Sequence, residues 1–357
     1  VNDAMDVLGG KGICLGPNNF MGRAYQELPV AITVEGANIL TRSLIIFGQG
    51  AIRCHPHVLA EMQAAQDPDH ARGLLAFDSA LFGHVRFAIS NKVRAWLSGL
   101  TGAFFLSAPE RAALETRTYF RELGRWAAAF AWVADVSMLV LGGSLKRREM
   151  LSARLGDVLA QLYLASAVLK RYEEDGRQRA DLPFVHWAMA DTVHRIEQAL
   201  DGVLANFPNA LIGLALRAVV FPLGRHARPP ADHWLRDIAA VLGTPSSQRD
   251  RLTAGMHVPT AEGEPLATLE AALVASVAAE AVEAKLRTAQ KAGQLPDATG
   301  EALTEAGLGA GIIVAEEAQL LRKAAILRAE VIRVDHFPAD LGLADARATQ
   351  GAQRAAA

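Results

Sequence analysis

The stretch TVEGANILTR, residues 33–42, places a single carboxylate, Glu35, between the β-branched Val34 and Gly36. Acidic side chains are rarely buried without a partner, so Glu35 either faces solvent in a turn or is held in an apolar site for a purpose. The pattern alone favours the surface. In an apolar site, burial would make the carboxylate a stronger base toward a carbon-bound proton, and Gly36 would let a ligand approach the backbone.

A second stretch, LGGKG at residues 8–12, places Gly9, Gly10 and Gly12 after a helical pattern. Glycines in such a position can end the helix, or they can bring the backbone close to a phosphate or a base. The stretch lacks the spacing and the strand–turn–helix context of a dinucleotide fingerprint. Taken alone, these residues indicate the end of a helix.

A third stretch, RCHPH at residues 53–57, collects Cys54, His55 and His57. Two histidines separated by one proline cannot share a helix face, and no second cluster in the sequence has metal-ligand spacing. We therefore interpret the stretch as a helix start and expect no metal. The sequence shows neither a P-loop nor the GxSxG elbow of a serine hydrolase.

The elements that must position these residues are predicted to be helical. Apolar residues recur at steps of three and four between Leu74 and Ile89 and between Leu155 and Leu169, which predicts two amphipathic helices. Breakers delimit further helices at about 110–141, 184–205, 210–220, 231–242, 266–291 and 312–332. Residues 9–36 are rich in glycine and proline and are expected to form a long functional loop. The predicted fold is all-α with one long catalytic loop.

Composition narrows the class of protein. The chain has 357 residues, 51% of them hydrophobic and 21% charged, which suits two folded domains. A net charge of -2 provides no basic field for nucleic acid, so no nucleic-acid partner is expected. Two cysteines without a CxxC motif favour the reducing cytoplasm. The longest apolar segments, residues 127–141 and 210–223, fall short of a membrane span and favour buried helices, although peripheral membrane contact remains open.

Taken together, the motifs resemble the flavin-dependent acyl-CoA dehydrogenases. That family has a GGxG turn, then a (Tyr/Val)-Glu-Gly-(Thr/Ala)-Asn loop, then an arginine in the next helix, and here Gly9, the VEGAN loop at residues 34–38 and Arg42 follow in that order. GGKGICLGPNN, the segment from ADVSMLVLGG to VLKRYE, and FPLGRHARPPAD resemble a bacterial fatty-acid β-oxidation subgroup with an extra carboxy-terminal helical domain. The composition shifts at QDPDH, residues 66–70, which predicts a domain boundary there, and the tail at 341–357 is expected to be disordered. With this boundary, the resemblance implies a catalytic-domain end at residues 1–66 and an appended helical domain at 67–340.

The resemblance implies a role for Glu35 as the catalytic base. It would remove the α-proton of a medium- or long-chain fatty acyl-CoA while the β-hydride passes to FAD, which gives a trans-2-enoyl-CoA. Hydrogen bonds to the thioester oxygen would stabilise the developing enolate, one of them from the backbone N–H of Glu35. Glu35 and Gly36 would therefore line the substrate site.

The resemblance also implies cofactor contacts. Gly9 and Gly10 match the turn that touches the adenine end of FAD on a neighbouring subunit, so a homo-oligomer is expected. Ala37 matches a position beside the cofactor, and Arg42 matches the family's arginine after the base, which would support either the loop or the cofactor. Ala37 replaces a frequent Thr and Asp6 a frequent Gln, so side-chain hydrogen bonds to FAD from these two positions are not implied.

The expected partners follow from the same family. They are a fatty acyl-CoA and an electron-transfer flavoprotein or equivalent acceptor, in the cytoplasm or at the inner face of the membrane. The family's amino-terminal helical domain and β domain have no counterpart here, so we expect this chain to be the carboxy-terminal part of the enzyme and inactive alone. The alternative is a helical interaction or membrane-docking module without catalytic activity.

Overall fold

A computed structural model describes residues 1–15, 19–33, 37–261 and 263–334. Helices are the only regular elements within these ranges, which confirms the all-α prediction. The chain divides into two compact units: the first unit comprises residues 1–32 and 240–357, and the second comprises residues 33–239. Each is described by itself. The domain boundary predicted near residue 66 remains a prediction.

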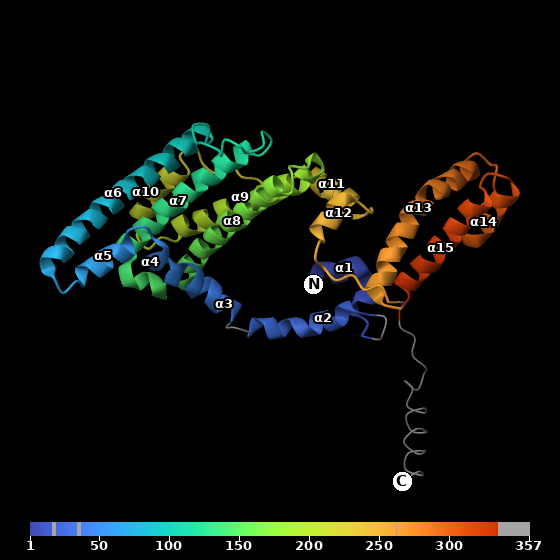
Figure 1. The fold of residues 1–357 in the computed structure, drawn as a ribbon, viewed down its shortest axis with the longest axis horizontal. Coiled ribbons are helices and arrows are strands. Elements are labelled where there is room, and N and C mark those ends of the chain that lie inside the picture. Colours follow the sequence, from blue (N-terminus) through green and yellow to red (C-terminus); the bar gives the residue numbers. More distant parts are fainter. Residues whose placement is uncertain (16–18, 34–36, 262, 335–357) are drawn as a thin grey trace, which may run out of the picture. The chain divides into compact units, whose positions relative to one another are not determined.

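The second unit is a bundle of long helices (Figure 1). Its main elements are α6 (His70–Thr101), α7 (Arg117–Leu141), α8 (Glu149–Glu174), α9 (Leu182–Ala205) and α10 (Ala210–Val220). Shorter elements precede them: α3 (Asn38–Leu40), η3 (Thr41–Gln49), α4 (Gly50–Cys54) and α5 (Val58–Ala65). Two 3₁₀ turns, η4 (Gly142–Arg147) and η5 (Arg179–Asp181), join the long helices, and α11 (Asp232–Leu242) continues into the first unit. The predicted helices at 184–205, 210–220 and 231–242 agree with these bounds to within two residues, whereas α6 runs well beyond the repeat that ends at Ile89, α8 extends past its repeat at both ends, and α7 begins later than predicted.

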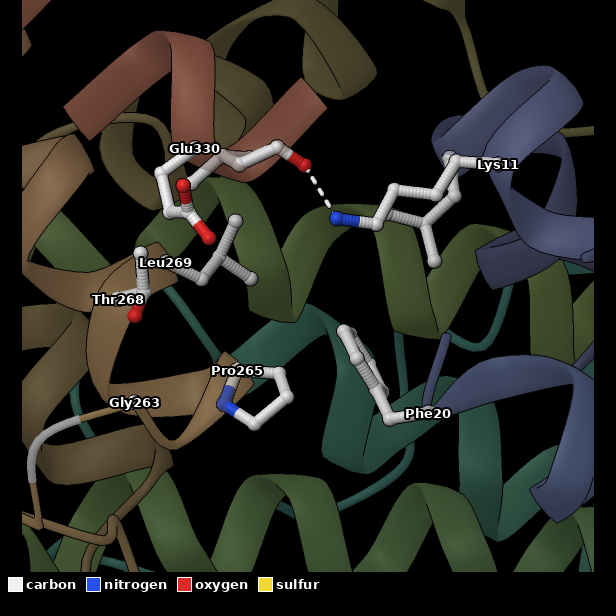
Figure 2. Close-up of a pocket in the computed structure, with 9 residues that line it drawn as sticks. Lys11, Phe20, Gly263, Pro265, Thr268, Leu269 and Glu330 are labelled. Atoms are coloured by element: carbon white, nitrogen blue, oxygen red, sulfur yellow. Dashed lines mark hydrogen bonds between the residues drawn. The ribbon is translucent and has the colours of Figure 1, made fainter. Parts of the chain in front are cut away.

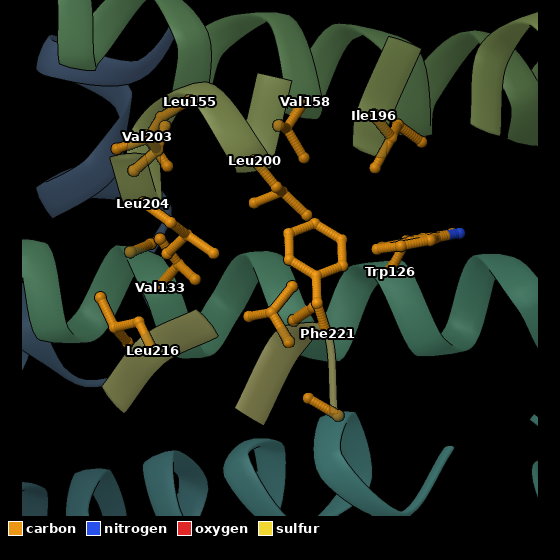
Figure 3. Close-up of a cluster of buried hydrophobic side chains, with 14 of the residues drawn as sticks. Trp126, Val133, Leu155, Val158, Ile196, Leu200, Val203, Leu204, Leu216 and Phe221 are labelled. Atoms are coloured by element: carbon orange, nitrogen blue, oxygen red, sulfur yellow. The ribbon is translucent and has the colours of Figure 1, made fainter. Parts of the chain in front are cut away.

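The core of the second unit lies where α7, α8, α9 and α10 meet (Figure 3). Leu155, Val158 and Leu200 have no exposed surface, and Trp126 packs against Phe221 with ring centroids 6.1 Å apart. Burying a large apolar side chain contributes about 1.5–3 kcal/mol. Residues 127–141 and 210–220 are helical and supply part of this core, which confirms the prediction for one face of each helix, whereas Leu139, Leu211 and Leu214 are exposed.

Side chains define where the helices of the second unit begin. The Asp69 carboxylate accepts from the backbone N–H groups of Ala71 and Arg72 at the start of α6, and Asn209 caps α10 in the same way. The other end of α6 stops at Gly102, whose φ of 59° suits a glycine. Residues 66–69 therefore form a tight turn between α5 and α6.

A buried acid on α9 holds the loop that contains FPLGRHARPP. Glu197 is 1% exposed, and its two carboxylate oxygens accept from the backbone N–H groups of His226 and Ala227, each at 3.0 Å. The Arg225 side chain lies 3.6 Å from the same carboxylate. We call these contacts of Glu197 with residues 225–227 the loop clamp. Both oxygens of the buried carboxylate are paired in it, as burial requires.

The first unit has its own core, formed by α13 (Pro265–Lys291), α14 (Gly300–Gly309) and α15 (Ala315–Ile332). α12 (Ser247–Leu252) precedes them. Small residues let these helices approach closely: Ala279 and Ala318 are fully buried, and a Cβ on Gly307 would lie 2.4 Å from Leu286.

The predicted long loop at residues 9–36 is wrong for much of its length. The chain forms α1 (Asn2–Leu8), then η1 (Gly9–Ile13), α2 (Met21–Glu27) and η2 (Leu28–Ile32). Asn19, 2% exposed, explains α2: its side-chain oxygen accepts from the N–H groups of Met21 and Gly22, and its amide donates to the Gly12 carbonyl. This cap offsets the low helix propensity that the glycines suggest.

Two helices in the described residues are long and apolar enough to cross a membrane by length and composition, α7 with its continuation to Arg147, and α13. Core helices of globular proteins meet the same criteria. α7 places Trp126, Ala129 and Val133 in the core of the second unit, and α13 places Ala279 and Leu286 in that of the first.

Candidate functional site

The predicted base and its glycine, Glu35 and Gly36, lie outside the described residues, so their roles remain predictions. The next described residue, Ala37, has an extended backbone and is the N-cap of α3. Its carbonyl accepts from the Thr41 N–H at 3.1 Å. The stretch that contains Glu35 therefore leads directly into a helix.

That helix continues as η3, in which nine residues, Thr41–Gln49, form π-helical turns. Such turns are rare and often occur at functional sites. η3 packs closely on α8, because a Cβ on Gly156 would lie only 3.2 Å from the Arg42 carbonyl. The Arg42 guanidinium forms a bidentate pair with Asp157, with Nε–Oδ1 at 2.7 Å and Nη2–Oδ2 at 2.5 Å. In the structure Arg42 is therefore paired with Asp157 of α8, and a contact between Arg42 and the cofactor remains a prediction.

The predicted cofactor glycines lie in the first unit. Gly9 ends α1 with a φ of 61°, and its N–H faces the carbonyls of Met5 and Asp6, which confirms the helix end. Both Gly9 and Gly10 are exposed, and a Cβ on either would meet nothing within 4 Å. Their backbone is open to a ligand, whereas Gly12 is buried against Met5.

Lys11, between these glycines, contacts the end of α15 (Figure 2). Its ammonium donates to the Val331 carbonyl at 2.6 Å, where the helix dipole favours a positive charge. The cavity beside it, lined in part by Phe20 and Pro265, measures about 40 Å³. That volume suits water and is too small for a nucleotide.

Sequence reasoning missed a buried cluster in the second unit. Asp135 on α7 lies between two imidazoles, with His55 Nε2 at 2.9 Å and His84 Nε2 at 3.7 Å from its Oδ1. His84 Nδ1 lies 2.8 Å from the Glu61 carboxylate. The sequence does contain one signal of this cluster, because Asp135 is a lone acid in an otherwise apolar helix segment.

The hydrogen bonds of His55 fix its tautomer. Its Nδ1 lies 3.2 Å from the backbone nitrogen of His57 and 3.1 Å from that of Val58, so Nδ1 accepts from two N–H groups. Nδ1 therefore carries no proton, and Nε2–H donates to Asp135. His55 thereby caps the start of α5, which confirms the helix-start interpretation for His55–His57, whereas Arg53 and Cys54 end the preceding helix α4.

The same tautomer decides what this cluster can bind. His55, His84 and Asp135 are close enough to hold a metal ion. A neutral histidine that binds a metal through Nε2 carries its proton on Nδ1, where His55 faces two N–H donors instead. The arrangement therefore suits a hydrogen-bonded network better than a metal centre.

Burial controls the charges in the cluster. It raises the pKa of Asp135, against the opposing effect of the two imidazoles. It lowers the pKa of His55, and the nearby Asp135 carboxylate only partly offsets this. His55 is consequently neutral near pH 7, in agreement with the tautomer that its hydrogen bonds require.

The cluster borders an apolar cavity of about 250 Å³. Its walls come from η3, α4, α6, α7 and α8 and include Phe47, Phe87, Phe130 and Met138. Asp135 also lines it, and the Asp135 Oδ2 atom is buried without a hydrogen-bond partner. An unpaired buried oxygen costs about 1–3 kcal/mol, which a water or another donor would recover.

A known protein family matches most of the chain. Residues 52–337 match the family model described as acyl-CoA dehydrogenase, C-terminal, bacterial type. No solved structure gives a significant match. The matched segment includes the His55–Asp135 cluster and begins ten residues after Arg42, so it does not contain Glu35. The family is one of oxidoreductases associated with a flavin. The chain therefore belongs to the bacterial-type C-terminal family of the acyl-CoA dehydrogenases.

Proposed function

We propose that this chain serves as the carboxy-terminal part of an FAD-dependent acyl-CoA dehydrogenase of fatty-acid β-oxidation. Its substrate would be a medium- or long-chain fatty acyl-CoA, and its product the trans-2-enoyl-CoA. The observation that carries the proposal is the family match at residues 52–337, preceded by the glycine turn, the VEGAN loop and Arg42 in the family's order. The assignment to the long-chain subgroup rests only on the sequence motifs that resemble it.

Glu35 is the proposed base. A thioester α-carbon is too weak an acid for a carboxylate in water, so the developing enolate needs hydrogen bonds at the thioester oxygen, one of them from the Glu35 N–H. Bound FAD would accept the β-hydride. Gly9 and Gly10 fit a cofactor contact because their backbone is open and exposed.

The packing of η3 supports a positioning role for the segment after Glu35. A base must be held within a fraction of an ångström, which requires rigid supporting elements. The Arg42–Asp157 pair and the close approach at Gly156 fix η3 on α8. The helix that follows the loop is thereby attached to the core of the second unit.

The test replaces Glu35 in the enzyme that contains this chain. Glu35→Gln should slow anaerobic flavin reduction by dodecanoyl-CoA by about 10²–10⁴-fold while FAD remains bound. Glu27→Gln, at an exposed carboxylate in α2, is the matched control and should keep the wild-type rate. An unchanged rate in the Glu35 variant would disprove the role of this residue.

The proposed partners are an electron-transfer flavoprotein or equivalent acceptor and further copies of the enzyme, in the cytoplasm or at the inner face of the membrane. A second candidate function is a helical docking module. The large apolar side chains exposed along α6 favour it. The two functions are compatible, because docking would use residues of the appended region.

A further inference from the structure

Helix α6 buries only small side chains completely, and Phe87 and His84 are half-buried beside the His55–Asp135 cluster, whereas most of its large apolar side chains are exposed. Its buried residues are Gly73, Asn91, Ala95, Ser98 and Gly99. α6 runs along the edge of the second-unit bundle (Figure 1). Packing against the bundle therefore does not account for the large apolar side chains on the exposed face of α6.

The exposed side chains form one continuous stripe, which we call the α6 stripe. Its main members are 44–73% exposed and are Leu74, Leu75, Phe82, Val85, Ile89 and Trp96. At about 100° per residue they fall within a sector of roughly 100° on the helix surface. The stripe extends over most of the helix length, about 48 Å for 32 residues at 1.5 Å each.

The area of the stripe exceeds what a solitary protein usually exposes. Leu81, Val93 and Leu100 flank the main members and are 37%, 45% and 38% exposed. At roughly 200 Å² for a fully exposed large apolar residue, the nine side chains present about 900 Å². Contiguous apolar patches on monomers are usually about 300–600 Å², whereas one side of a stable protein interface buries about 800 Å².

Two charged residues lie within the stripe, and their positions are symmetric. Asp78 lies seven residues before Val85, and Lys92 lies seven residues after it. Both are exposed, and Lys92 Nζ lies 5.5 Å from the centre of the Trp132 ring. In an antiparallel pair of α6 helices centred on Val85, each Asp78 would face Lys92 of the other copy. A parallel pair would place like charges together, which is unfavourable.

The apolar residues follow the same symmetry. Positions 74, 78, 81, 85, 89, 92 and 96 have spacings of 4, 3, 4, 4, 3 and 4, which read the same in both directions. Antiparallel pairing sets Leu74 against Trp96, Leu81 against Ile89 and Val85 against itself. A two-fold interface requires this kind of self-complementary surface.

We propose that the α6 stripe is a self-association surface, on which a second copy of this chain packs its own α6 antiparallel about a two-fold axis at Val85. The pairing is independent of the dehydrogenase assignment, since it uses no residue of the catalytic motifs. It also differs from the oligomer implied by the glycine turn, which lies in the first unit.

The first test measures mass in solution by size-exclusion chromatography with light scattering, over a range of protein concentrations. The 357-residue chain should be a dimer, and Asp78→Lys or Lys92→Asp should raise the dissociation constant at least tenfold. The double variant Asp78→Lys/Lys92→Asp should restore dimers. Arg94→Asp is the matched control for Lys92→Asp, because it makes the same charge change on α6 outside the stripe. Circular dichroism should show the same helix content in all variants.

The second test determines the register of the two paired α6 helices by cysteine cross-linking. In a Cys14→Ser/Cys54→Ser background, Val85→Cys should form an intermolecular disulfide rapidly under mild oxidation, whereas Ala76→Cys, exposed on the other side of α6, should not. A monomer at every concentration would overturn the proposal, as would equal cross-linking of both cysteines. Binding of the monomer to phosphatidylcholine–phosphatidylglycerol vesicles, lost on Phe82→Glu, would replace the second copy with a lipid surface.

Discussion

Helices α6 and α8 have similar apolar repeats in the sequence and opposite environments in the structure. Leu155, Val158 and Leu169 of α8 have no exposed surface, whereas Val85 and Ile89 of α6 are 47% and 55% exposed. α8 packs one face against η3, α7 and α9, while the residues that α6 buries fully are all small. An apolar repeat thus predicts a helix with an apolar face, but not which surface covers that face.

Truncating one apolar side chain in each helix should give the largest contrast. Leu155→Ala leaves a cavity in a closed core and should lower the free energy of unfolding by about 2–5 kcal/mol. Ile89→Ala should change it by less than about 0.5 kcal/mol at concentrations where the chain is monomeric. Urea unfolding followed by circular dichroism measures both. Equal losses would mean that α6 is covered within a single chain.

The same contrast applies to acids on α9. Glu197→Ala leaves the buried N–H groups of His226 and Ala227 unpaired and should cost about 2–4 kcal/mol. Asp201→Ala, which removes ion pairs with Arg217 and Arg225 nearer the surface, should cost about 1 kcal/mol or less. Urea titration compares the two, and a larger loss at Asp201 would contradict the loop clamp.

The smallest expected effect is pH dependence at a half-buried imidazole. Burial lowers the pKa of His186 from its ordinary 6.5, and its Nδ1 is hydrogen-bonded to the Tyr119 hydroxyl at 2.6 Å. Below pH 6.5 the unfolded chain therefore binds a proton at His186 more readily than the folded chain does. The free energy of unfolding should fall as the pH drops from 6.5, by at most about 1.4 kcal/mol per pH unit from this group.

His186→Gln tests that pH effect, because glutamine does not titrate. Thermal unfolding of the variant between pH 7 and pH 5 should show a shallower loss of stability than the wild type. The comparison between the two proteins isolates His186 from the other histidines. The same slope in both would show that His186 has no part in it.

Much of the helical framework could be predicted because its signals are local. The start and end of α9 and α13 follow from apolar periodicity and nearby breakers, and the helix start predicted at RCHPH is correct for its last three residues. α2 could not be predicted, since its cap depends on how Asn19 folds back onto Gly12. The pairing of His55 with Asp135, 80 residues apart, leaves no local pattern.

By itself, the sequence determined the all-α class, the helix order and the family motifs, because backbone propensity and motif spacing act over a few residues. The tertiary structure decided which faces are buried, how Arg42 is held and which imidazole nitrogen of His55 carries the proton. Those properties depend on contacts between distant residues, and burial and hydrogen-bond geometry exist only after the helices have packed.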